Sequence, residues 1–227
     1  MMDIELHYEE QGAGEPLILL HGNGGDCFYF SGQMDAFARR FRTIALDTRG
    51  HGASPRGEKP FTISQFADDL ADFMDERGIA RAHLLGFSDG GNIALVFALR
   101  HPDRVGRLVL NGANLFFDGL TPEVRRDILA TYERARASAD RDPAGKHLAD
   151  LQRLMIDEPN IDPSQLAALG MPALVIVGDD DMIEHEHSRL IAGALPQGRM
   201  VVLTGSHFVA EEDPAAFNEA VLAFLEP

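Results

Sequence analysis

The sequence predicts an α/β fold, a doubly wound and mostly parallel sheet that carries a small helical cap. Six short apolar runs are continuous, which is typical of strands buried on both faces. Between these runs lie segments with apolar residues at every third or fourth position, as in helices that cover a sheet. One long stretch breaks the alternation, which predicts an insertion.

The first segment differs from the six continuous runs. Residues 4–9 alternate between apolar and polar side chains, so we expect a half-exposed strand that pairs antiparallel at the margin of the sheet. The buried strands are then expected at residues 16–20, 42–46, 82–85, 107–110, 173–177 and 200–203.

Helices are expected between these strands. Residues 63–74 place their apolar side chains on one stripe, with Thr62 or Ser64 available as the N-cap and Gly78 as the stop. Residues 92–99 are apolar nearly all round, which predicts a helix buried between the sheet and its neighbours.

The insertion is predicted at residues 112–170. Thr121 followed by Pro122 has the form of an N-cap with proline at the first helical position, and two stretches with helical spacing follow it. We therefore expect one domain over residues 1–227, with a helical cap at 112–170 inserted within it.

Composition limits the classes of partner. The 227 residues are 45% apolar and 25% charged, which suits one globular domain, and the net charge of −16 disfavours nucleic acid and anionic membrane surfaces. No apolar run reaches the ~20 residues of a membrane helix. The single cysteine, Cys27, and an acidic N-terminus predict a cytoplasmic protein. The sequence does not predict an oligomeric state.

The strongest chemical motif is Gly86-Phe87-Ser88-Asp89-Gly90-Gly91, a G-x-S-x-G between a predicted strand and a predicted helix. Small residues at positions 86 and 90 allow a tight, strained turn that exposes the hydroxyl of Ser88 at the carboxyl end of the strand. The alternative is an ordinary strand-to-helix turn.

A serine nucleophile needs a base and an acid that orients the base. Asp179, Asp180 and Asp181 follow one predicted strand, and His207 follows the next. The order serine, aspartate, histidine is the one expected for this architecture. His185 and His187 are two residues apart, so we expect them on an exposed helix face and not as a metal pair.

With these motifs the chain resembles α/β-hydrolase-fold serine hydrolases nearly end to end, in particular small esterases and biphenyl-hydrolase-like members. Residues 21–25 are similar to the oxyanion loop of that family, and residues 47–54 are similar to its turn after the next strand. The resemblance selects Asp181 as the acid, three residues after Gly178. His185 departs from the pattern, because the family often has proline four residues after the acid.

The resemblance implies that Ser88 attacks an acyl carbon, that His207 moves the proton and that Asp181 orients the imidazole. The backbone N–H groups of Asn23 and Asp89 would form the oxyanion hole. No cofactor and no metal are expected.

Three residues are candidates for substrate binding. The carboxylate of Asp89 either interacts with the dipole of its own helix or attracts a cationic substrate, as in some similar enzymes. Phe116 and Phe117 stand where the insertion begins, and at least one is expected to line an apolar pocket over Ser88; the alternative is packing of the cap on the core.

We therefore expect a cofactor-independent serine hydrolase of small carboxylic esters or related acyl bonds. Hydrolysis of lactones, thioesters or carbon–carbon bonds suits the same residues. The alternative from another class is a small-molecule sensor that retains the three residues and signals through movement of the cap. The physiological substrate is not predicted.

Overall fold

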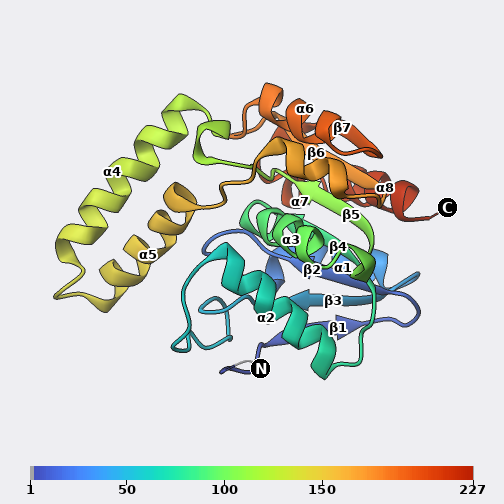
Figure 1. The fold of residues 1–227 in the computed structure, drawn as a ribbon, viewed down its shortest axis with the longest axis horizontal. Helices are drawn as coiled ribbons and strands as arrows, with labels where there is room; N and C mark the ends of the chain where they lie inside the picture. The colour runs from blue at the N-terminus through green and yellow to red at the C-terminus, as the bar shows by residue number, and fades with distance from the viewer. Residues whose placement is uncertain (1–2, 227) are drawn as a thin grey trace.

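The computed structural model describes residues 3–226 and contains one seven-stranded sheet (Figure 1). The strand order is β1-β3-β2-β4-β5-β6-β7, and all neighbours are parallel except β1, which pairs antiparallel with β3. The doubly wound, mostly parallel fold class is confirmed. The strands are β1 (Tyr8–Gln11), β2 (Pro16–Leu20), β3 (Arg42–Leu46), β4 (Ala82–Phe87), β5 (Val105–Asn111), β6 (Ala173–Asp180) and β7 (Gly198–Ser206).

Helices cover both faces of the sheet. The α-helices are α1 (Ser31–Phe37), α2 (Ile63–Glu76), α3 (Asp89–Arg100), α4 (Pro122–Ser138), α5 (Pro143–Asp157), α6 (His185–Ala194), α7 (Val209–Glu212) and α8 (Pro214–Leu225). Short 3-10 turns are η1 (Cys27–Phe30), η2 (Pro102–Arg104), η3 (Phe117–Gly119) and η4 (Pro163–Ala168).

Strand β2 shows why the inner strands read as continuous apolar runs. Ile18 and Leu20 join the core cluster formed with α2, α3 and α6, whereas Leu17 and Leu19 join the cluster formed with α1 and α8. Because successive side chains of a strand point to opposite faces, both faces of β2 are buried.

Two edge strands differ from the expectation. The strand predicted at residues 4–9 begins at Tyr8, at the expected antiparallel margin. Strand β7, predicted to be buried on both faces, alternates in burial, and Val202 is 47% exposed. The reason is its position at the open edge of the sheet, where β6 is its one partner among the described strands.

Helices α4 and α5 lie between β5 and β6, where residues 112–170 were expected to leave the sheet. The two helices run side by side as a hairpin that projects away from the sheet (Figure 1). At its base, Leu120, Ile128 and Ile183 form a small apolar cluster, and Leu154 of α5 belongs to the main core. The hairpin is thus anchored on the domain beside the carboxyl ends of the strands.

A buried ion pair stabilises the turn after β3. The guanidinium of Arg49 is fully buried and bonds to both carboxylate oxygens of Asp69 at 2.7 Å and to Asp3. Such a pair is costly to break, because removing one partner leaves an uncompensated buried charge. Among residues 3–226, no helix is long and apolar enough to cross a membrane.

Candidate active site

Ser88 occupies the tight turn between β4 and α3. Its backbone angles are φ +52° and ψ −121°, and it is the only non-glycine residue with positive φ in the part of the chain that the structure describes. Its N–H donates to the carbonyl of Asn111 at 2.7 Å, which fixes the turn against β5. A backbone of this kind costs about 1–3 kcal/mol and persists only where its surroundings impose it.

Two glycines make this turn possible. A Cβ on Gly86 would overlap the backbone of Gly90, and a Cβ on Gly90 would overlap the carbonyl of Leu20. Strand β4, helix α3 and the end of β2 therefore approach one another more closely than any side chain allows. This is the steric reason for glycine on both sides of Ser88.

His207 and Asp181 come together from the ends of β7 and β6. The Nδ1 of His207 donates to Oδ1 of Asp181 at 2.7 Å, and both side chains are buried. His207 Nε2 has no hydrogen-bond partner among the described residues. The ring of His207 lies 4.8 Å from the ring of Phe87, the residue before Ser88, so the histidine stands beside the serine turn.

Asp181 is the aspartate of its triplet that bonds to His207. Burial alone would raise its pKa, but hydrogen bonds from His207 and from the N–H groups of Ile183 and Gly178 keep the pKa below its usual value. Asp179 and Asp180 are exposed, and Asp179 accepts instead from the N–H of Gly205 at 2.9 Å.

The two histidines of α6 do not lie on an exposed face, and this expectation was wrong. His185 Nε2 bonds to the carbonyl of Gly178 at 2.9 Å, so it holds the turn between β6 and α6. His187 is buried, and its Nε2 accepts the N–H of Leu115 at 2.9 Å. Burial lowers the pKa of His187, which suits a neutral ring with a structural role.

The loop after β2 lies against the serine turn. A Cβ on Gly22 would be 2.9 Å from the ring of Phe87 and 3.1 Å from the Cβ of Ser88. His21 shapes the loop, since its Nδ1 bonds to the carbonyl of Gly22 at 2.7 Å and its Nε2 accepts the N–H of Thr48 at 3.0 Å. Burial lowers the pKa of His21, so the ring stays neutral.

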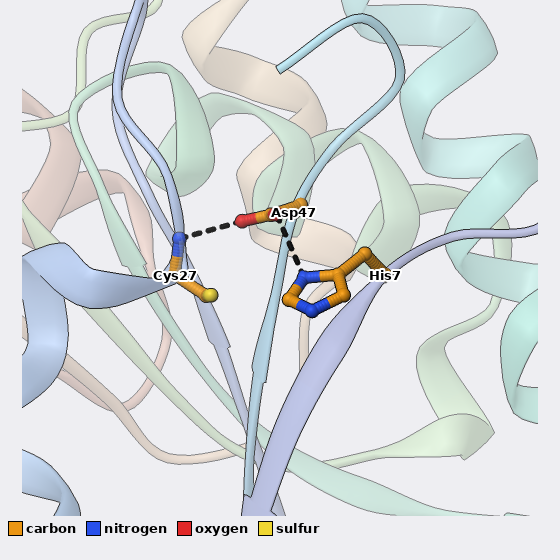
Figure 2. Close-up of side chains that lie close together, drawn as sticks. All are labelled: His7, Cys27 and Asp47. Carbon is orange, nitrogen blue, oxygen red and sulfur yellow. Dashed lines mark hydrogen bonds and ion pairs between the residues drawn. The ribbon is translucent and has the colours of Figure 1, made fainter. Parts of the chain in front are cut away.

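Asp47 holds the far end of this loop, as Figure 2 shows. Its carboxylate accepts the N–H of Cys27 at 2.7 Å and the Nδ1–H of His7 at 2.9 Å. It also accepts the N–H of Ala53 at 2.8 Å. The sequence did not predict this cluster, because its members come from three separate segments.

His7, Cys27 and Asp47 also offer a nitrogen, a sulfur and an oxygen within 4.8 Å of one another, a set that could hold a metal. Two observations favour a structural role. Backbone amides already occupy the carboxylate, and burial together with the neighbouring Asp47 raises the pKa of the Cys27 thiol to about 12. A metal needs the thiolate, which this environment disfavours.

Asp89, the residue after Ser88, is buried with its carboxylate oxygens in use. The side-chain amide of Asn23 donates to Oδ2 at 2.8 Å, and that of Asn92 donates to Oδ1 at 3.2 Å. Burial raises the pKa of Asp89 to about 6, against the lowering effect of the two amides. The contact with Asn23 was missed, since no local pattern marks a contact between residues 66 positions apart. The contact with Asn92 was overlooked, although a spacing of three residues on one helix brings side chains together.

Phe116 and Phe117 are both half-buried at the start of the insertion. Phe116 packs on the main core with its ring 4.6 Å from the ring of His187, and Phe117 packs on the small cluster at the base of the hairpin. Each ring therefore has a packing role, and each keeps a partly accessible surface. A contact with substrate stays a prediction.

Known proteins similar to this chain share its architecture. The profile of the alpha/beta hydrolase fold family matches residues 15–155. A relative from Caulobacter vibrioides strain NA1000, named as a candidate carbamate hydrolase (RutD), is 32% identical over 260 residues, which include 97% of this chain and 95% of the relative.

Two solved structures illustrate the likeness. The enol-lactonase from Burkholderia xenovorans LB400 has 28% identity and a TM-score of 0.84, with 99% of this chain and 97% of that chain covered. A thermophilic esterase from Thermogutta terrifontis has 27% identity and a TM-score of 0.83, with 98% and 93% covered. With the family profile and the full-length relative in agreement with the fold, this chain belongs to the α/β-hydrolase fold family.

Proposed function

We propose that this protein is a cofactor-independent serine hydrolase that cleaves small carboxylic esters or related acyl bonds through an acyl-enzyme on Ser88. The observation that carries the proposal is the state of His207. Its Nδ1 is bonded to a buried carboxylate, and its Nε2 has no hydrogen-bond partner within residues 3–226 and stands beside a strained serine turn. A neutral imidazole held in this way has its basic nitrogen available for a hydroxyl proton.

The reaction follows from these positions. His207 Nε2 accepts the proton of Ser88 while Oγ attacks the acyl carbon, and the proton is then given to the leaving alkoxide. A water molecule, deprotonated by His207 in the same way, then attacks the acyl-enzyme and releases the carboxylic acid product. Asp181 keeps the Nδ1 proton in place and stabilises the imidazolium. Hydrogen bonds from the N–H groups of Gly178 and Ile183 hold its carboxylate in position for this role.

Backbone N–H groups of Asn23 and Asp89 are the proposed donors to the oxyanion. Gly22 brings the loop into contact range of Ser88, and Asp89 starts α3, where helix N–H groups lack internal partners. Donors fixed before the reaction are worth about 3–4 kcal/mol of barrier in comparable sites.

The substrate class is proposed from the site and its relatives together. Names of the similar proteins include an esterase, an enol-lactonase and a candidate carbamate hydrolase, all of which act on an acyl carbon. We propose that residues 112–170 form the cap over the site, with the accessible parts of Phe116 and Phe117 facing the acyl chain.

The test combines labelling with turnover. We expect a fluorophosphonate probe to label the wild type and not Ser88→Ala, and we expect p-nitrophenyl acetate, a lactone and an aryl carbamate to show which acyl bond turns over fastest. Ser138→Ala, a change in α4, is the matched control. Ester turnover by Ser88→Ala at the wild-type rate would overturn the mechanism, and labelling without turnover would favour a sensor.

A further inference from the structure

One side-chain amide ties three separate segments together next to the site. The Nδ2 of Asn23 donates to Oδ2 of Asp89 at 2.8 Å and to the carbonyl of Leu151 at 3.1 Å. Asn23 belongs to the loop after β2, Asp89 begins α3, and Leu151 lies in α5 of the helical hairpin. The loop is therefore bonded both to the serine turn and to the insertion.

The other carboxylate oxygen of Asp89, Oδ1, is connected by hydrogen bonds to the start of the insertion. Asn92 donates to Oδ1 of Asp89 at 3.2 Å and to Oδ1 of Asn114 at 3.0 Å, and its own Oδ1 accepts the N–H of Asn114 at 3.0 Å. Asn114 in turn donates to the carbonyl of Phe116 at 3.1 Å. Hydrogen bonds from this one carboxylate thus reach helix α5 of the hairpin through Asn23 and the segment that leads from β5 to the hairpin through Asn92.

A carboxylate is required at the centre of this arrangement. Asp89 receives one amide on each oxygen, and an ionised carboxylate is the side chain that offers acceptors on both sides. An asparagine would keep one oxygen and set its NH₂ against the NH₂ of Asn23 or of Asn92. Because Asp89 is only 6% exposed, water has little room to repair that mismatch.

We propose that Asp89 is a positioning residue that couples the helical insertion to the oxyanion hole through the side chain of Asn23. This inference rests on the proposed function, since the N–H of Asn23 is one of the two proposed oxyanion donors. A shift of α5 that moves the carbonyl of Leu151 pulls on Asn23, so the oxyanion hole is completed when the insertion is seated.

The same contacts bear on the alternative role of Asp89 as a site for cationic substrates. Each oxygen already has an amide partner, and the residue is buried. A role in positioning predicts that charged and uncharged esters lose rate together, whereas a cation site predicts loss for the charged ester alone.

The test uses Asp89→Asn and Asn23→Ala, singly and together. We expect each single variant to lower kcat for p-nitrophenyl acetate about 10- to 100-fold with KM within a few-fold, because the donor is misplaced and not removed. The loss of kcat in the double variant should be no larger than in the slower single variant, since both substitutions break the same hydrogen bond between Asn23 and Asp89. Asp127→Asn, an exposed carboxylate on α4, is the control.

A second readout does not depend on catalysis. Hydrogen exchange should become faster in both variants at residues 22–25 and around Leu151, and should stay unchanged in Asp127→Asn. If Asp89→Asn fails to fold, Asn23→Ala carries the same test.

Three results would overturn the inference: unchanged exchange in both segments, additive losses in the double variant, or a rate loss confined to an amino-acid ester. A failure of the proposed function is separate, because it would appear as full ester turnover in Ser88→Ala.

Discussion

Replacing Asp181 with asparagine removes the charge that faces the imidazole while it keeps the size of the side chain. In the structure, Oδ1 accepts from His207 Nδ1 at 2.7 Å and from the N–H of Ile183 at 3.0 Å, and Oδ2 accepts from the N–H of Gly178 at 3.1 Å. Both oxygens therefore serve as acceptors, and an amide can supply only one.

Both orientations of the new amide are unfavourable. If its oxygen takes the Oδ1 position, the imidazolium loses its negative partner and the NH₂ meets the N–H of Gly178. If the amide turns over, its NH₂ donates to Nδ1 of His207 and moves the ring proton to Nε2, so the base is lost. The expected loss in kcat is about 10⁴-fold, as in comparable triads, or about 5 kcal/mol of barrier.

The assay compares kcat for p-nitrophenyl acetate in Asp181→Asn, Asp180→Asn and Asp179→Asn, with circular dichroism to show that each variant is folded. Asp180 and Asp179 are exposed, so their variants should stay within a few-fold of the wild type. A larger loss in either of them than in Asp181→Asn would refute the assignment of the acid, as would a folded Asp181→Asn variant that retains more than a tenth of the wild-type rate.

Three further outcomes are expected. The raised pKa of Asp89, about 6 against about 4 in an unfolded chain, means that the folded protein retains this proton where the unfolded chain has lost it. Its contribution to the free energy of unfolding therefore falls by as much as about 3 kcal/mol between pH 4 and pH 6. When the free energy of unfolding is measured by chemical denaturation at several pH values, Asp89→Asn should not show this decrease. Arg49→Leu, which leaves Asp69 buried and unpaired, should cost about 3–5 kcal/mol and lower Tm by about 10 °C in calorimetry; an unchanged Tm would contradict it. Phe116→Ala and Phe117→Ala should change the preference among ester chain lengths more than Tm, whereas loss of Tm with unchanged preference would assign both rings to packing alone.

The fold could be predicted because its strands are marked locally. Inner strands are buried on both faces, so their sequences are continuous apolar runs whatever their neighbours are. Strand β7 shows the limit of this rule, because residues 200–203 are as apolar as an inner strand, while their exposure follows from the place of β7 at the edge of the described sheet.

The candidate site could be predicted where local chemistry and strand ends coincide. Ser88 is marked by its glycines, and Asp181 and His207 follow strands that become neighbours in a parallel sheet. The contact between Asn23 and Asp89 could not be predicted, because it depends on the packing of separate segments. The contact of Asn92 is marked in the sequence, because it lies three residues after Asp89 on the same helix.

In the proposed mechanism, Ser88 carries the acyl group. Rapid acid quenching of the enzyme with p-nitrophenyl acetate, followed by peptide mass spectrometry, tests it directly, and His207→Ala serves as the variant that should not acylate at a comparable rate. We expect one added acetyl group on the peptide that contains Ser88, formed in step with a burst of p-nitrophenol and absent in Ser88→Ala. Acetylation of another residue at the rate of turnover, or steady turnover by Ser88→Ala, would contradict it.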